Sequence, residues 1–93
     1  MNIDELREKA RSLPLLPGVY LMSDREGVII YVGKAKALKN RVSQYFQDTP
    51  HDVKTAVMVR QVASFDYIVV GSEFEALVLE CALIKRHMPR YNV

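Results

Sequence analysis

The chain has 93 residues, a net charge of +2 and a composition that is 49% hydrophobic and 26% charged. This balance is typical of a globular domain and excludes a disordered chain. No apolar run approaches the roughly 20 residues that a membrane span requires, and the N-terminus has no apolar segment typical of a signal peptide. We therefore expect one domain over residues 1–93, without a membrane partner. The one cysteine, Cys81, lies in an apolar run, which predicts a buried thiol and a reducing, cytoplasmic setting.

The elements follow in a simple order. Residues 3–12 predict an amphipathic helix, which prolines at 14 and 17 end. Two strands are expected over 18–23 and 28–33, joined by a turn at 24–27, and they predict a β-hairpin. Further helices are expected over 38–46, 53–63 and 73–87, with a strand at 65–71 before the last of them. Ser72 and Glu75 have the spacing of a capping box. This order predicts an α/β (α+β) fold with a small, three-stranded, mainly antiparallel sheet flanked by helices.

The hairpin carries a tyrosine and a glycine on each arm. A four-residue turn predicts that Tyr20 lies opposite Tyr31, and Gly18 opposite Gly33, so that the tyrosines share one face. The opposite face then holds a stripe of aliphatic core residues, namely Val19, Leu21, Val28, Ile30 and Val32. Two adjacent tyrosines are either half-buried aromatics or, with their phenol pKa lowered by nearby cations, candidates for a general base.

Basic residues gather in two tracts that contain no acid, residues 27–47 and 81–93. The first holds Lys34, Lys36, Lys39 and Arg41, and the second holds Lys85, Arg86 and Arg90. Such tracts indicate either a footprint for a polyanion or a solvated surface. Within the first tract, Arg41 and Tyr45 are four residues apart on the predicted helix, so their side chains meet on one flank.

Glu80 is the least expected residue of the last helix. At helical spacing its neighbours are all apolar, namely Ala76, Leu77, Leu83 and Ile84. A carboxylate on an apolar stripe is costly unless a cation or a hydrogen-bond donor meets it. Glu80 is therefore either paired with a basic residue or a metal ligand or general base that faces a cleft. The two histidines, His51 in a turn and His87 at a helix end, are expected to be structural.

The paired segments Gly18-Val19-Tyr20 and Tyr31-Val32-Gly33 resemble the motif of the GIY-YIG nuclease superfamily. The continuation VGKAKALKNRVSQYF and the ending LECALIKRHMPRYNV are similar to the branch of that superfamily that makes incisions in bacterial nucleotide excision repair. The resemblance runs from Pro17 to Val93. It implies a one-metal endonuclease that hydrolyses a phosphodiester on the 3′ side of a lesion in damaged double-stranded DNA, using Mg²⁺ or Mn²⁺.

The resemblance also implies site residues. Tyr20 and Tyr31 match the motif tyrosines, one of them the general base, and Lys34 matches the lysine beside the base. Arg41 matches the arginine that holds the scissile phosphate, with Tyr45 on the same helix face. Glu80 matches the metal ligand and Asn92 a bracing asparagine near the C-terminus. DNA contacts are expected at Lys34, Lys36, Lys39 and Arg41. One departure is Ala82, where the family usually has asparagine, and it puts a contact behind the site in doubt.

Two other functions fit the same residues. A non-catalytic nucleic-acid-binding module needs only the basic tracts and exposed aromatics, and a structural domain needs only a paired glutamate. By resemblance, the chain is the N-terminal part of a longer protein, and its partner is the damage-loading subunit of the excinuclease, contacted through regions beyond residues 1–93.

Overall fold

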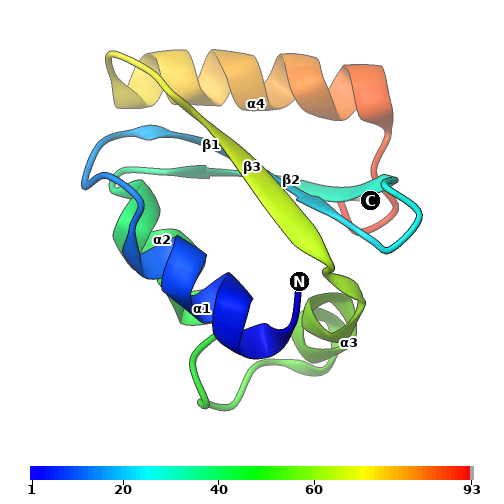
Figure 1. Ribbon diagram of the computed structural model, residues 1–93. Helices are drawn as coiled ribbons and strands as arrows, with labels where there is room; N and C mark the ends of the chain where they lie inside the picture. The colour runs from blue at the N-terminus through cyan, green and yellow to red at the C-terminus, as the bar shows by residue number, and fades with distance from the viewer. Residues whose placement is uncertain (93) are drawn as a thin grey trace.

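The computed structural model describes residues 1–92, which form four helices and three strands (Figure 1). In chain order these are α1 (Ile3–Arg11), β1 (Gly18–Ser23), β2 (Ile29–Ala35), α2 (Leu38–Tyr45), α3 (Val53–Gln61), β3 (Ser64–Val69) and α4 (Glu73–His87). The predicted elements are all present, with ends that differ by a few residues. Across residues 1–92, no helix is both long enough and apolar enough to cross a membrane.

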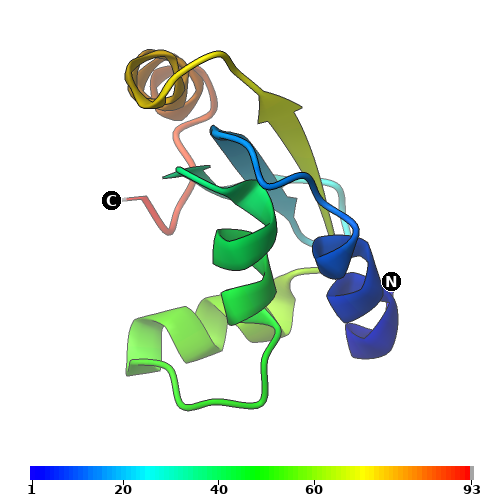
Figure 2. The same cartoon turned by 90° about the vertical axis from the view of Figure 1, so that its left-hand side faces the viewer.

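The strands form one antiparallel sheet in the order β2-β1-β3, which confirms the predicted α+β class. Helix α4 covers one face of this sheet, and α1, α2 and α3 lie on the other (Figures 1 and 2). Because β1 is central, β2 and β3 are both edge strands. Helices thus cover both faces of the sheet, although most residues of the edge strand β3 remain exposed.

Each face of the sheet has its own apolar cluster. The larger cluster, beneath α1, α2 and α3, contains Tyr20, Met22, Ile30 and Phe46 among its buried members. The smaller cluster, beneath α4, is aliphatic and is built on Val19, Val32 and Ala76. The predicted aliphatic stripe is therefore only partly right: Val19, Leu21 and Val32 lie beneath α4, whereas Ile30 lies on the opposite side and Val28 is exposed.

The register of the hairpin differs from the prediction by two residues. Tyr20 lies opposite Gly33, not Tyr31, and Gly18 lies opposite Ala35. One residue of the shift comes from the turn, because Ser23 pairs with Ile29 and not with Val28. The second comes from a β-bulge that leaves Ile30 as the extra residue between Ile29 and Tyr31. Two single shifts add up to an even number, so both tyrosines remain on one face, now as diagonal neighbours.

Gly33 is required by Tyr20. A Cβ atom at Gly33 would collide with the ring carbons and the hydroxyl of Tyr20, because the Tyr20 ring crosses β2 at this position. The sequence predicted that this strand ends at Gly33. In the structure the strand continues past Gly33 to Ala35. The glycine of one arm and the tyrosine of the other are thus a single packing unit.

The helix ends explain why the elements begin where they do. The side chains of Asn2, Asp52 and Ser72 accept hydrogen bonds from backbone N–H groups at the starts of α1, α3 and α4, respectively. At α4 the predicted capping box is only half formed, since Glu75 accepts a hydrogen bond from the Gly71 N–H at 3.3 Å, outside the helix. The prediction of a buried Cys81 is wrong, because its thiol is exposed. The apolar run around Cys81 suggested burial, but α4 carries apolar residues on its exposed outer surface as well.

Candidate active site

Three tyrosines meet beneath α2. The hydroxyls of Tyr20 and Tyr45 form a hydrogen bond of 2.7 Å, and both side chains are buried. The Tyr31 ring lies 6.2 Å from that of Tyr20 and 6.4 Å from that of Tyr45, measured between centroids. Tyr31 is only partly buried. It is therefore the motif tyrosine that solvent and a substrate can reach.

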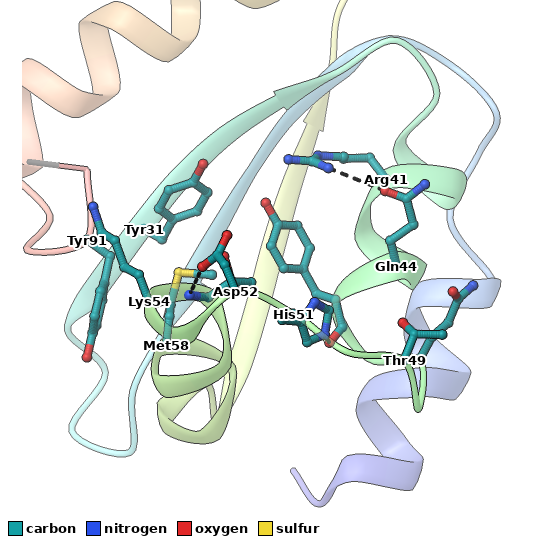
Figure 3. A pocket seen from close by; sticks show the side chains of 12 residues that line it. Tyr31, Arg41, Gln44, Thr49, His51, Asp52, Lys54, Met58 and Tyr91 are labelled. Carbon is teal, nitrogen blue, oxygen red and sulfur yellow. Dashed lines mark hydrogen bonds between the residues drawn. The ribbon is translucent and has the colours of Figure 1, made fainter.

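A cleft of about 550 Å³, named here the tyrosine cleft, opens between β2, α2 and α3. Its walls include Tyr31, Tyr45, Arg41, Gln44, His51 and Lys54. Figure 3 shows Tyr31 on β2 and Arg41 on α2 facing the space between these elements. The Arg41 guanidinium lies 5.2 Å from the centre of the Tyr45 ring and donates a hydrogen bond of 3.3 Å to Gln44 Oε1. The predicted meeting of Arg41 and Tyr45 on one helix flank is confirmed.

The pKa values of Tyr20 and Tyr31 are raised, whereas the general-base alternative required nearby cations to lower them. Burial and nearby Tyr45 together raise the pKa of Tyr31 to about 12, with Arg41 opposing the shift. Burial also raises the pKa of Tyr20 well above the usual range of a phenol. Desolvation of the phenolate thus outweighs the attraction of the one nearby arginine. In the protein as described, both phenols hold their protons at neutral pH.

Glu80 approaches this site from the other side of the sheet. It lies on α4 and is only partly exposed, and its charge is close enough to Tyr31 to raise the pKa of that phenol. Because β2 is an edge strand, a side chain from α4 can approach Tyr31 around the free edge. Among residues 1–92, Glu80 makes no hydrogen bond and no salt bridge, which excludes the pairing with a basic residue that the sequence left open.

The free edge of β2 is held by the C-terminal segment. The Asn92 side chain accepts a hydrogen bond from Val32 N–H at 2.9 Å and donates one to Val32 C=O at 2.8 Å. The Tyr91 N–H donates to Ile30 C=O at 3.1 Å. Asn92 therefore occupies the ladder positions that a further strand would fill, and it fixes β2 next to Tyr31.

The predicted basic residues do not form one surface. Arg41 lines the tyrosine cleft, while Lys39 lines a different cleft beside α1. Lys34 and Lys36 lie near Glu73 of α4, with 3.8 Å between Lys36 Nζ and Glu73 Oε1. Lys34 pairs with Val19, which belongs to the cluster beneath α4, so strand alternation places it on the face opposite Tyr31. The structure thus separates Lys34 from the three tyrosines.

Some residues of the cleft were missed in the sequence. Gln44 follows Arg41 by three residues, a helical spacing that predicts contact, and the Arg41–Gln44 hydrogen bond confirms it. A ring nitrogen of His51 lies 3.1 Å from Tyr45 C=O, which ties the turn before α3 to the end of α2. This contact agrees with a structural role for His51. Lys54 reaches the cleft only because α3 packs beside α2, and no local pattern signals that.

Comparison with known proteins identifies the family. A model of the UvrC-like GIY-YIG domain matches residues 16–93. The chain belongs to this family. UvrABC system protein C of Caldanaerobacter subterraneus subsp. tengcongensis is 60% identical over 90 residues, which cover 96% of this chain and 15% of that protein. The corresponding protein of Desulfitobacterium hafniense is 56% identical over 92 residues, covering 99% of this chain and again 15% of the relative. The chain therefore spans about 15% of the length of these relatives.

Solved structures of the UvrC family share the whole fold. The GIY-YIG N-terminal endonuclease domain of UvrC from Thermotoga maritima, bound to its catalytic divalent cation, magnesium, is 39% identical to this chain, with a TM-score of 0.87 and complete coverage of both chains. A point mutant of the same domain bound to the catalytic divalent cation has a TM-score of 0.88 at 39% identity and covers 100% of this chain and 99% of its own. Because Tyr31 and Arg41 line it, the tyrosine cleft is the candidate active site.

Proposed function

We propose that this chain is a metal-dependent DNA endonuclease domain. One observation carries the proposal: the Glu80 carboxylate, unpaired among residues 1–92, is close enough to act on the phenol of Tyr31, and Tyr31 and Arg41 line the same cleft. A binding module has no need of an unpaired glutamate beside a phenol. The UvrC domains with the same fold bind a catalytic divalent cation, which supports the same reading.

Glu80 is the residue that would hold the cation. No group of three or more His, Cys, Asp or Glu side chains with metal-site spacing exists among residues 1–92, so a closed structural site is not available there. A single carboxylate with open space and water suits Mg²⁺, which keeps several waters and binds few protein groups, and Mn²⁺ is the alternative. When bound, the cation polarises the phosphate and stabilises the leaving 3′ oxygen.

The residues in and around the tyrosine cleft have separate proposed roles in the reaction. Arg41 binds the scissile phosphate and stabilises the charge that develops on it. Tyr31 is the better placed general base, because it lines the cleft, whereas the Tyr20 hydroxyl is buried and bonded to Tyr45. Because the pKa of Tyr31 is raised to about 12, Tyr31 can accept a proton only once a cation held at Glu80 lowers that pKa. Tyr20 and Tyr45 then orient Tyr31 and Arg41, and Asn92 fixes the strand that carries Tyr31. Lys34 remains a predicted neighbour of the base, and reaching it requires the side chain to cross the edge of β2.

The proposed biological role is inferred from the UvrC relatives. We infer that the chain is the N-terminal domain of a longer protein that makes the 3′ incision in bacterial nucleotide excision repair in the cytoplasm. The match to only 15% of each UvrC relative supports a domain of a larger chain. Damaged double-stranded DNA is then the substrate. The damage-loading subunit of the excinuclease is the partner, contacted through regions beyond residues 1–93.

Cleavage of labelled duplex DNA with Mg²⁺ and with EDTA tests the function. We expect cleavage only with the metal, and a loss of at least roughly 100-fold for Glu80→Gln, since even residues behind a metal ligand are worth 10–100-fold. Glu26→Gln, a glutamate in the exposed hairpin turn, is the matched control and should cleave normally. Equal cleavage by the wild type and Glu80→Gln would leave the non-catalytic binding module as the better interpretation.

A further inference from the structure

A second cleft, named here the α1–α2 cleft, has a volume of about 750 Å³ and lies beside the helices α1 and α2. These helices pack against each other on the same face of the sheet (Figure 2). The side chains that matter for its chemistry are Arg7, Arg11, Lys39, Ser43, Gln44 and Gln47. The predicted DNA contacts included only Lys39 from this set.

The α1–α2 cleft is strongly cationic. Three cations line it, Arg7, Arg11 and Lys39, against one carboxylate, Asp48. Arg7 donates to Phe46 C=O at 2.5 Å and to an Asp4 carboxylate oxygen at 3.5 Å, so its charge is partly offset by Asp4. Neither Arg11 nor Lys39 forms a salt bridge or side-chain hydrogen bond within residues 1–92, so both charges are available to a ligand. The cleft therefore matches a polyanion better than the region around Lys34 and Lys36, where Glu73 offsets the charge.

Uncharged donors complete the same cleft. Ser43 lines it, and its Oγ is buried without a hydrogen-bond partner in the part of the chain that the structure describes. A buried hydroxyl without a partner is rare in native proteins. Because this oxygen is enclosed, it meets a phosphate in the cleft only if the Ser43 side chain rotates outward. Asn40, Gln44 and Gln47 add amide groups that donate hydrogen bonds. Phosphate oxygens, which only accept, are the ligand class that cations, hydroxyls and amides bind together.

The α1–α2 cleft is continuous with the tyrosine cleft. Gln44 and Gln47 line both of them, and Gln44 also accepts the hydrogen bond from Arg41. Lys39 and Arg41 are two residues apart on α2, so they point to different sides of the helix, one toward each cleft. A single strand of nucleic acid that passes Arg41 can therefore extend over α2 into the α1–α2 cleft.

We propose that the α1–α2 cleft is a second phosphate subsite, which binds the DNA backbone next to the scissile phosphate. The proposal rests on the proposed function and adds the path of the substrate strand. The family model begins at residue 16, so α1, which contributes Arg7 and Arg11, lies outside the family model, although the Thermotoga maritima domain matches the whole chain. Contacts of this kind fix the register of the strand on the protein and carry no sequence preference.

Salt-dependent DNA binding tests the subsite without relying on cleavage. A fluorescein-labelled duplex is titrated with the chain in EDTA at several salt concentrations, and the slope of log K against log salt is measured. The Thermotoga maritima UvrC domain of the same extent folds as an isolated chain, so the 93-residue chain is the right material. For Arg11→Gln/Lys39→Gln we expect Kd to rise roughly tenfold and the slope to fall by about 2, close to one unit for each lost phosphate contact.

Two control variants separate the subsite from net charge and from folding. Lys85→Gln/Arg86→Gln removes the same charge from the exposed end of α4 and should leave the slope unchanged. Arg11→Lys/Lys39→Arg keeps the charge and should bind like the wild type. Equal slopes for the wild type and Arg11→Gln/Lys39→Gln, equal losses for both charge-removing variants, or no binding by the wild type at low salt would each overturn the proposal.

This test can fail independently of the proposed function. The slope is measured in EDTA, where no metal-dependent cleavage occurs, and Glu80 does not line the α1–α2 cleft. If Glu80→Gln loses cleavage as expected but Arg11→Gln/Lys39→Gln keeps the wild-type slope, the subsite is rejected and the endonuclease is kept. If Glu80→Gln cleaves like the wild type but the slope falls in Arg11→Gln/Lys39→Gln, the DNA-binding cleft is kept and the endonuclease is rejected.

Discussion

The two faces of the sheet hold different kinds of side chain. The face under α1, α2 and α3 buries Tyr20 and Tyr45, with Tyr31 partly buried against them, so two of its candidate catalytic groups are also core residues. The face under α4 is a plain aliphatic cluster, and its candidate metal ligand, Glu80, has no structural partner among residues 1–92. Function and stability should therefore be inseparable on the first face and separable on the second.

Gly33→Ala should have the largest effect on stability. The new Cβ collides with the Tyr20 ring, which has 1% of its surface exposed and no space to retreat into. We expect a loss of about 1–3 kcal/mol in the free energy of unfolding, together with a loss of cleavage, because Tyr20 and its partner Tyr45 must move. Urea denaturation followed by circular dichroism measures the first quantity.

The control for that change is Gly27→Asn. Gly27 has φ +80° in an open turn with no atom within 4 Å of an added Cβ, and asparagine tolerates this conformation. Its stability should stay within roughly 1 kcal/mol of the wild type. Equal stability of Gly33→Ala and the wild type would show that the Tyr20 ring does not need the space over β2.

Alkaline pH should have the next largest effect, because it lowers the stability of the protein through the buried tyrosines. The pKa of Tyr31 is about 12 in the folded protein and about 10 in the unfolded chain, so the unfolded state loses its proton first. Stability is fully present below pH 10 and falls as the pH rises from about 10 to about 12. Tyr20 adds to the same decline, because its pKa is raised further.

Thermal melts of the wild type and Tyr31→Phe between pH 8 and roughly 12 measure this decline. The loss of melting temperature with pH should be shallower in Tyr31→Phe, since phenylalanine has no proton to release. Parallel curves for the two proteins would mean that Tyr31 titrates alike in both states.

Glu80→Gln should have the smallest effect on stability. Its carboxylate makes no hydrogen bond or salt bridge within the described residues, and the amide has nearly the same shape, so we expect a change within about 0.5 kcal/mol. The same variant should lose cleavage. A destabilisation above 2 kcal/mol would reveal a structural contact at Glu80 and remove the contrast between the two faces.

Local patterns predicted the elements better than their pairing. Turn composition, helix caps and β-branched runs are short-range signals, and every predicted helix and strand is present. The register was wrong because the turn is one residue longer than predicted and because a β-bulge at Ile30 leaves no mark in the sequence. The burial of Cys81 was wrong because α4 is apolar on its outer surface too, with Phe74 and Val78 exposed.

The candidate site was predictable to a similar extent. The motif and helical spacing brought Tyr20, Tyr31, Arg41 and Tyr45 together, and Glu80 was singled out by its apolar neighbours alone. Lys34 was grouped with the tyrosines by its place in the chain, although strand alternation sends it to the other face. Arg7 and Arg11 join Lys39 only through the packing of α1 on α2, which no local pattern encodes.

The central claim is that Glu80 binds the cation beside Tyr31. A crystal of the chain soaked in Mn²⁺, with anomalous scattering used to locate the ion, tests it without DNA and without the rest of a longer protein. We expect one peak within bonding distance of a Glu80 carboxylate oxygen, facing Tyr31 and Arg41. A well-ordered Glu80 with no peak, or a peak bound only by other carboxylates, would contradict it.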